Sequence, residues 1–259
     1  EDVLAREFDF HKWSESEVFR VKSTIPERAR ESLRLTQNSE ELFGERTVDF
    51  RFQNGVLRFP SPVEALHPEN AEAFGEYFER KKSCGAVIIL GHWNAEKKTY
   101  NQLARHYRRA GLSALRLTLP YHDHRRPVAM KLASGLMGPN LDLTIQSMSQ
   151  AVREVRAAVT WLESQGHARI GLVSSSMGSM VALLALCHEP RLKAMVGYLT
   201  AADLTEVICR GTATQHVWDK LKDHLTRRDL AETWSCINPE NYLGKLQIRE
   251  LHTHVGQAK

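Results

Sequence analysis

Long hydrophobic runs are absent from this sequence. The longest apolar run, Met180 to Cys187, is far shorter than the roughly 20 residues that a membrane-spanning helix needs. The amino end, EDVLAREFDF, is charged and has no apolar segment of the kind that a signal peptide carries. The sequence therefore predicts a protein without a membrane span. Because the first residue is not methionine, we expect a trimmed or partial chain.

Cysteine is also scarce. The 259 residues include four cysteines, at positions 84, 187, 209 and 236, which form no C-x-x-C pair and no paired metal-ligand spacing. Cys187 lies in the apolar run and is interpreted as a small core residue. This pattern does not fit a disulfide framework and favours a reducing compartment, so we expect a cytoplasmic protein.

Charge of one sign is not concentrated in any part of the chain. The 35 Lys and Arg residues are interleaved with 31 Asp and Glu residues, which leaves a formal net charge of only +4. The short pairs Lys81-Lys82, Arg125-Arg126 and Arg227-Arg228 are interpreted as solvated surface. We therefore expect an ordinary globular protein that does not bind nucleic acid.

A β-hairpin is predicted near residue 54. Val48, Phe50 and Phe52 alternate with polar residues, and Val56 follows the dipeptide Asn54-Gly55. Asn and Gly both accept the positive φ of a type I′ turn, which makes this pattern the strongest short hairpin signal.

Continuously apolar segments then alternate with helical patterns. The predicted strands are residues 86–90, 113–120, 168–174 and 194–199. The predicted helices are residues 69–80, residues 97–110, a long helix that ends before Gly166, and an apolar helix after Ser176. Strands that are apolar throughout are covered on both faces. We predict an α/β fold with a mostly parallel, doubly wound sheet and an antiparallel N-terminal hairpin.

The chain is predicted to have two parts. Residues 1–45 are polar and favour helix, and are interpreted as an N-terminal helical extension. Residues 46–259 form the α/β domain. Within it, residues 203–245 are helical and polar and are interpreted as a cap or an excursion, and residues 247–255 begin another strand.

The strongest candidate for catalysis is the run from Gly171 to Gly178, GLVSSSMG, where a strand passes into a helix. A nucleophile on such a turn has a cramped backbone, which requires small residues two positions before and two after it. Ser174 and Gly178 fill these positions around Ser176, although Ser174 replaces the first glycine of the usual G-x-S-x-G pattern. The N–H groups that begin the following helix, with Met177 first, would stabilise an oxyanion. Alternatively, these serines are only helix N-caps.

Two other predicted strands end in polar loops at the same edge of the sheet, where ligands of parallel sheets bind. In the first loop, GHWNA from position 91, Trp93 or Asn94 would supply a second oxyanion N–H, and Trp93 is favoured over Asn94. Simple packing of this loop over the sheet is the alternative.

The second loop contains His122, Asp123 and His124, which together resemble a metal site. A catalytic zinc needs about three well-placed ligands, and no other cluster lies at a comparable strand end. We therefore interpret the segment as a hydrogen-bonded loop at the mouth of the site.

In these segments the sequence resembles the α/β-hydrolase superfamily. The resemblance rests on AVIILGHWNAE, SALRLTLPYHDHRRP and IGLVSSSMGSMVALL in that order, with AMVGYLTAADLTEVICRG after them. It covers roughly residues 46–255 and is strongest to a poorly characterised branch of abhydrolase-domain proteins with an HWN-like segment after a strand. The resemblance implies a serine hydrolase with Ser176 as nucleophile and Met177 as an oxyanion donor.

The resemblance also implies a triad in the chain order Ser, then Asp or Glu, then His. The acid is expected after the strand that follows the cap, so the acid, the histidine and the last strands of the fold are expected beyond Lys259. Asp203 is the best candidate acid inside the chain, because some hydrolases place the acid after the preceding strand. His252 and His254 are interpreted as histidines on the face of a strand.

Three functions are compatible with these residues. The favoured one is hydrolysis of an ester, thioester or amide in a small-molecule acyl substrate, through an acyl-enzyme on Ser176 and without a cofactor. The second is a non-catalytic or truncated hydrolase scaffold that lacks the triad acid and histidine. The third is a metallohydrolase that uses His122, Asp123 and His124.

Overall fold

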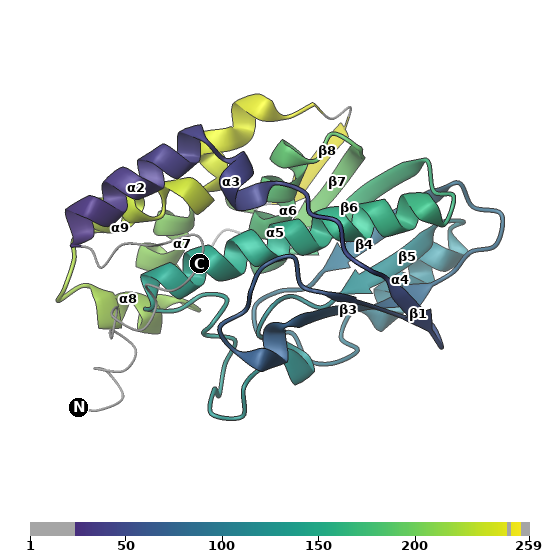
Figure 1. The fold of residues 1–259 in the computed structure, drawn as a ribbon, viewed down its shortest axis with the longest axis horizontal. Coiled ribbons are helices and arrows are strands. Elements are labelled where there is room, and N and C mark those ends of the chain that lie inside the picture. The colour runs from purple at the N-terminus through teal and green to yellow at the C-terminus, as the bar shows by residue number, and fades with distance from the viewer. Residues whose placement is uncertain (1–23, 248–249, 255–259) are drawn as a thin grey trace.

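The computed structural model describes residues 24–247 and 250–254 (Figure 1). Within them, one eight-stranded sheet has the strand order β1-β2-β3-β5-β4-β6-β7-β8. The strands are β1 (Arg51–Gln53), β2 (Val56–Pro60), β3 (Glu72–Phe78), β4 (Gly85–Leu90), β5 (Ser113–Leu117), β6 (Arg169–Ser175), β7 (Leu192–Tyr198) and β8 (Glu250–His254). Strands β5, β4, β6, β7 and β8 are parallel to one another, whereas β1, β2 and β3 are joined antiparallel. The predicted α/β class and mostly parallel sheet are confirmed.

The antiparallel part contains the predicted hairpin. Asn54 and Gly55 join β1 to β2 with φ values of 52° and 76°, as a type I′ turn requires. Strand β1 is shorter than the sequence pattern predicts, because Val48 and Phe50 lie before its first residue.

The helix predicted over residues 69–80 is wrong, because Glu72–Phe78 form strand β3 and only a short 3-10 turn, Pro68–Asn70, precedes it. Its alanine and glutamate residues favour a helix locally, but β3 pairs with β2 on one side and with β5 on the other. Gly75 lies so close to β5 that an added Cβ would stand 3.0 Å from the carbonyl oxygen of Arg116. Pairing with segments distant in sequence therefore outweighs the local preference.

Helices cover both faces of the parallel part, as predicted. On one face of β4, Ala86, Ile88 and Leu90 join a core with α5 (Leu141–Ser164) and α6 (Met177–His188). On the other face, Val87 and Ile89 pack against α4 (Asn101–Arg109). Helix α5 ends as predicted, since Gly166 follows it with a φ of 88°.

The predicted cap region is helical. It contains α7 (Leu204–Arg210), α8 (Gln215–Leu221) and α9 (Arg227–Thr233), followed by short 3-10 turns that lead to β8. Trp234 is completely buried and donates its indole N–H to the carbonyl of Leu141, at the start of α5. No helix in the described part of the chain has both the length and the apolar character needed to cross a membrane.

The described residues of the N-terminal extension pack on the rest of the protein. Helix α2 (Ile25–Gln37) lies beside α9 (Figure 1), and the buried Arg28 forms an ion pair with Asp142 of α5. Helix α3 (Glu40–Phe43) contacts α5. A boundary at residue 45 between an extension and a separate domain remains a prediction.

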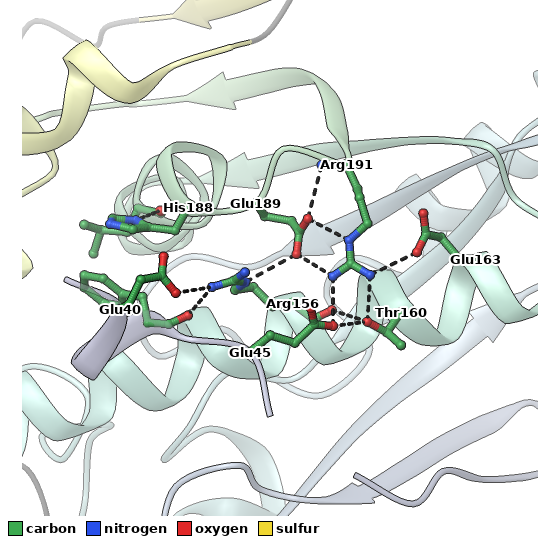
Figure 2. Close-up of polar contacts among 10 residues, drawn as sticks. Glu40, Glu45, Arg156, Thr160, Glu163, His188, Glu189 and Arg191 are labelled. Carbon is green, nitrogen blue, oxygen red and sulfur yellow. Dashed lines mark hydrogen bonds and ion pairs between the residues drawn. The ribbon is translucent and has the colours of Figure 1, made fainter. Parts of the chain in front are cut away.

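A cluster of ion pairs connects residues 40–45 to α5 and to the segment before β7 (Figure 2). Glu189 lies between Arg156, at 3.3 Å, and Arg191, at 2.6 Å. Arg191 also contacts Glu45 at 2.9 Å. Burial alone would raise the pKa of Glu189, but the hydrogen bonds and charges of the two arginines outweigh it and lower that pKa. The cluster therefore keeps a buried carboxylate ionised.

His188 is buried beside this cluster, and we predict that it makes the protein acid-sensitive. Its ring nitrogens contact the carbonyl of Leu184 at 2.7 Å and the hydroxyl of Ser39 at 3.0 Å. Burial lowers the pKa of His188 from 6.5 to about 4. Between these values the unfolded chain binds the proton more readily, so stability falls as the pH decreases. The free energy of unfolding should fall by about 2–3 kcal/mol between pH 7.5 and 4.5 through this group alone.

Urea denaturation at the two pH values, on the wild type and on His188→Gln, measures this contribution. The variant should lose about 2–3 kcal/mol less than the wild type on acidification, because its side chain does not titrate. The same loss in both proteins would show that other groups cause the acid sensitivity.

Candidate active site

Ser176 is the single residue between the end of β6 and the start of α6, and its backbone is strained. It has a φ of 52° and a ψ of −119°, a conformation that residues other than glycine seldom adopt. Its N–H donates to the carbonyl of Tyr198 over 2.8 Å, and its own carbonyl accepts from the N–H of Ser179 over 2.8 Å. These bonds on both sides hold the sharp turn in place.

The side chain of Ser176 does not cap α6. The residue occupies the N-cap position, but its hydroxyl accepts no capping hydrogen bond and has no hydrogen-bond partner among the described residues. The side chain is half-buried. The interpretation of Ser176 as an ordinary helix cap is therefore wrong.

The small residues on either side of Ser176 have the structural roles that the turn requires. A Cβ at Gly178 would lie 2.5 Å from the carbonyl oxygen of Gly91 and 2.6 Å from that of Leu90, so only glycine fits there. Ser174 is 2% exposed, and its hydroxyl lies 3.5 Å from the carbonyl oxygen of Val196. Serine thus fits in place of the first glycine of the usual pattern.

Met177 begins α6 and brings a backbone N–H to the turn. The first N–H groups of a helix have no partner within the helix, and they carry its positive partial charge. The Met177 side chain is buried at 4% exposure, which fixes the backbone at this point. The geometry can therefore stabilise a negative charge that develops beside Ser176.

The loop after β4 contains a β-turn, residues 92–95. The N–H of Ala95 donates to the carbonyl of His92 over 3.1 Å, and Asn94 has the positive φ, 61°, that the third position of a type II turn requires. His92 donates its N–H to the Tyr100 hydroxyl over 3.2 Å.

One backbone N–H of this turn takes part in no hydrogen bond among the described residues. Asn94 donates its N–H to Nε2 of His122 over 3.0 Å, so its amide is not available as an oxyanion donor. The Trp93 N–H has no partner among the described residues. It points away from the turn, because it lies trans to the His92 carbonyl that accepts from Ala95.

The side chain of Trp93 connects the turn to two other segments. Its indole N–H donates to the carbonyl of Ala133 over 3.0 Å, and Ala133 in turn donates its N–H to the side chain of Asn94. The indole also stacks on the ring of His216 in α8, with ring centroids 5.4 Å apart and an interplanar angle of 3°. The cap region therefore contacts the turn directly.

The three residues of the metal-site interpretation do not converge. Both ring nitrogens of His122 are hydrogen-bonded. Asp123 lies 3.5 Å from Arg116, and His124 packs on the ring of Phe74 at a centroid distance of 4.1 Å. Among the described residues, no group of three or more His, Cys, Asp or Glu side chains could hold a metal ion. The metal interpretation of these three residues is therefore wrong, and the hydrogen-bonded loop is the observed structure.

Asp203 follows β7 and caps α7. One carboxylate oxygen accepts the N–H groups of Thr205, over 2.8 Å, and Glu206, over 3.2 Å. Within the described part of the chain, no hydrogen bond joins Ser176 to Asp203 or to a histidine. The role of Asp203 as the triad acid remains a prediction. His252 lies on β8 opposite Val196, on a strand as predicted, and the side chain of His254 lies outside what the structure describes.

Sequence reasoning missed a buried ion pair near the site. Arg125 was expected on the surface with Arg126, but it is completely buried and contacts Glu154 of α5 at 2.6 Å. Of this pair only Arg126 is exposed. The other two pairs, Lys81-Lys82 and Arg227-Arg228, are exposed as expected. The available signal was the acidic residue Glu154, which lies between the apolar positions Val152 and Val155 of the long helix.

Comparisons with solved structures show the same fold at low sequence identity. Acetyl xylan esterase from Paenibacillus sp. R4 is similar with a TM-score of 0.59 and 12% identity, over 88% of this chain and 88% of that chain. Acetyl xylan esterase 1 from Thermoanaerobacterium sp. JW/SL YS485 has a TM-score of 0.58 and 13% identity, over 90% and 87%. The acylaminoacyl peptidase of Pyrococcus horikoshii has a TM-score of 0.54 and 14% identity, over 80% of this chain but only 32% of that one.

No curated protein sequence matches the chain significantly. Residues 80–254, which are more than half of the chain, match a protein family described as alpha/beta hydrolase domain containing 18. The matched region includes the Ser176 turn, the Trp93 loop and the cap helices. The chain belongs to the family alpha/beta hydrolase domain containing 18.

Proposed function

We propose that the protein is a serine hydrolase that cleaves an ester, thioester or amide through an acyl-enzyme on Ser176. The observation that carries the proposal is the backbone of Ser176, a non-glycine residue with φ 52° and ψ −119° at a strand-to-helix turn. Strain of this kind persists where the surroundings over-determine it, and it concentrates at functional sites. A nucleophile elbow of α/β hydrolases has this position and this sharp turn.

In the proposed mechanism, the hydroxyl oxygen of Ser176 attacks the carbonyl carbon of the substrate, and the carbonyl oxygen becomes negatively charged. The N–H groups of Met177 and Trp93 donate to this oxyanion. Each such donor lowers the barrier by about 3 kcal/mol, because it is already oriented when the charge develops. The alcohol, thiol or amine then leaves, and water hydrolyses the acyl-enzyme and restores the serine.

The mechanism uses groups of the protein alone and needs no cofactor. It requires a general base that accepts the proton of Ser176, because a neutral hydroxyl is a weak nucleophile. Asp203 is the candidate for the acid that orients this base. The reactivity of the Ser176 hydroxyl measures whether a base reaches it, because only an activated hydroxyl is a strong nucleophile.

The comparisons favour small acyl esters as the first substrates to examine. Two of the solved structures with this fold are named acetyl xylan esterases, and a third is named an acylaminoacyl peptidase. One fold supports many substrates, so these names define classes of bond to test and not a particular substrate.

A fluorophosphonate probe tests the proposal on the full chain. We expect one covalent adduct, which peptide mapping by mass spectrometry should locate on Ser176, together with turnover of at least one p-nitrophenyl ester in a series that begins with acetate. Probe reacted with urea-unfolded protein controls for nonspecific labelling. A folded protein that never reacts would support the non-catalytic scaffold instead, and an adduct on another serine would move the site.

A further inference from the structure

The loop that carries Trp93 is held by a neighbouring loop, residues 118–126. The backbone N–H of Asn94 donates to Nε2 of His122 over 3.0 Å, and Nδ1 of the same ring donates to the carbonyl of Pro120 over 2.9 Å. His122 is only 5% exposed, so water competes little for either bond. These two bonds require a neutral ring with its proton on Nδ1.

Residues of both loops have left-handed backbone conformations. The φ values are 61° for Asn94, 62° for Tyr121 and 52° for Asp123. Such a φ is unfavourable for a bulky side chain and persists only where other contacts outweigh its cost. Tyr121 is 1% exposed, and its N–H donates to the side-chain oxygen of Asn70 over 2.7 Å. The strained backbone of Tyr121, next to His122, indicates that the 118–126 loop is held in one specific shape.

The buried ion pair holds the 118–126 loop on α5. Arg125 donates to both carboxylate oxygens of Glu154, over 2.7 and 2.6 Å. It also donates to the carbonyl of Thr118 over 2.8 Å, and its own carbonyl accepts from the amide of Asn70 over 2.8 Å. A bidentate arginine–carboxylate pair fixes orientation as well as distance. The loop is thus held on α5 near both of its ends, with His122 between them.

We propose that His122 is a positioning residue of the Ser176 site, and that it fixes the amide of Trp93 where an oxyanion develops. This role rests on the proposed function. An oxyanion donor is effective only if it is oriented before the charge develops, and a shift of about 1 Å weakens it strongly. The bond from Asn94 to His122 fixes the peptide group that follows Trp93, while the bond from Ala95 to His92 fixes the peptide group that precedes it.

The two bonds of the His122 ring can be removed separately. In His122→Gln, the amide oxygen reaches the position of Nε2 and can accept from Asn94. In His122→Asn, the shorter side chain can still donate to Pro120 but does not reach Asn94. Each variant therefore keeps one of the two bonds, and only His122→Asn loses the bond that the proposal requires.

We expect the labelling rate of His122→Asn to fall by about 10- to 100-fold, below the 10²- to 10³-fold loss for complete removal of an oxyanion donor. His122→Gln should stay within about threefold of the wild type, because it keeps the acceptor. With an ester substrate, kcat of the asparagine variant should fall while KM stays unchanged, since the lost interaction exists only in the transition state. His124→Asn, which alters the exposed neighbouring histidine, serves as the matched control.

Amide hydrogen exchange gives a readout that is independent of catalysis. The Asn94 amide should exchange at least about tenfold faster in His122→Asn than in the wild type, and at a nearly unchanged rate in His122→Gln. If His122→Asn does not fold, His122→Leu removes the same acceptor and fills the buried site with an apolar side chain.

The outcomes separate the two proposals. A wild-type chain that is not labelled would overturn the proposed function, and the role of His122 in that reaction with it. A wild type and His122→Asn that are labelled at equal rates would overturn the role of His122 alone. Equal exchange of the Asn94 amide in all three proteins would show that the His122 bond does not hold the loop.

Discussion

Ser176→Ala should lose fluorophosphonate labelling completely, and its kcat on any ester that the wild type hydrolyses should fall by about 10⁴-fold or more. The reason is covalent: without the hydroxyl oxygen, no acyl-enzyme forms, and only the oxyanion donors remain to accelerate the reaction. Alanine keeps the Cβ of serine and the same backbone strain, and the Ser176 hydroxyl has no hydrogen-bond partner among the described residues. The free energy of unfolding should therefore change by less than about 0.5 kcal/mol.

Ser175→Ala is the matched control for this variant. Ser175 is the neighbouring residue, and it is half-buried as Ser176 is, but it ends β6 in ordinary strand geometry. Its loss should leave the labelling rate within about threefold of the wild type, as expected for a side chain outside the reaction. Persistent labelling of Ser176→Ala would locate the reactive residue elsewhere and refute the assignment of Ser176.

Glu154→Gln should lower the free energy of unfolding by about 3–5 kcal/mol, as measured by urea denaturation at pH 7. The carboxylate accepts hydrogen bonds from both terminal guanidinium nitrogens of Arg125. It also accepts from the hydroxyl of Ser61 and the side-chain amide of Gln150, and the four distances are 2.6 to 2.9 Å. Arg125 is completely buried, so the substitution leaves a positive charge without its counter-ion in a place that water does not reach. The cost is mainly that of the unpaired charge and not of the lost contact.

Glu163→Gln tests whether the position of the ion pair decides the effect. Glu163 lies on the same helix and contacts Arg191 at 2.9 Å, but its side chain is 44% exposed. Water solvates both groups when such a pair is broken, so its loss should cost less than about 1 kcal/mol. Similar losses in the two variants would contradict the view that the buried charge of Arg125 depends on Glu154 as its counter-ion.

Several elements could be predicted because their determinants are local. Strand β4 lies between β5 and β6 in the parallel part of the sheet and is apolar at every position, since both of its faces are covered. Asn54-Gly55 forms the predicted turn because few other residues accept two successive positive φ values. The turn at Ser176 was predictable for a similar reason, because the small residues Ser174 and Gly178 flank it at the spacing that a cramped strand-to-helix turn requires.

Other elements could not be predicted because their determinants are distant in sequence. The Glu and Ala residues of segment 69–80 favour a helix, and residues 72–78 become strand β3 through their pairing with β2 and β5. Arg125 resembles a surface cation until α5 brings Glu154 against it. The same limit applies to the site. The hydrogen bond from Asn94 to His122 engages the backbone N–H of Asn94, and the N–H of Trp93 has no partner among the described residues. This hydrogen bond forms only where the loop after β4 meets the loop after β5.

The order of strands and helices in the parallel part, and the cramped residue at their central junction, were thus determined by the sequence itself, because apolar periodicity and backbone sterics act between neighbours along the chain. Which polar groups are buried, which of them are paired and which amide of the 92–95 turn has no partner among the described residues were decided only by the tertiary structure. Burial, hydrogen bonding and the pairing that makes β3 a strand depend on what lies opposite a residue in space, and for these groups the partners come from other loops, strands and helices.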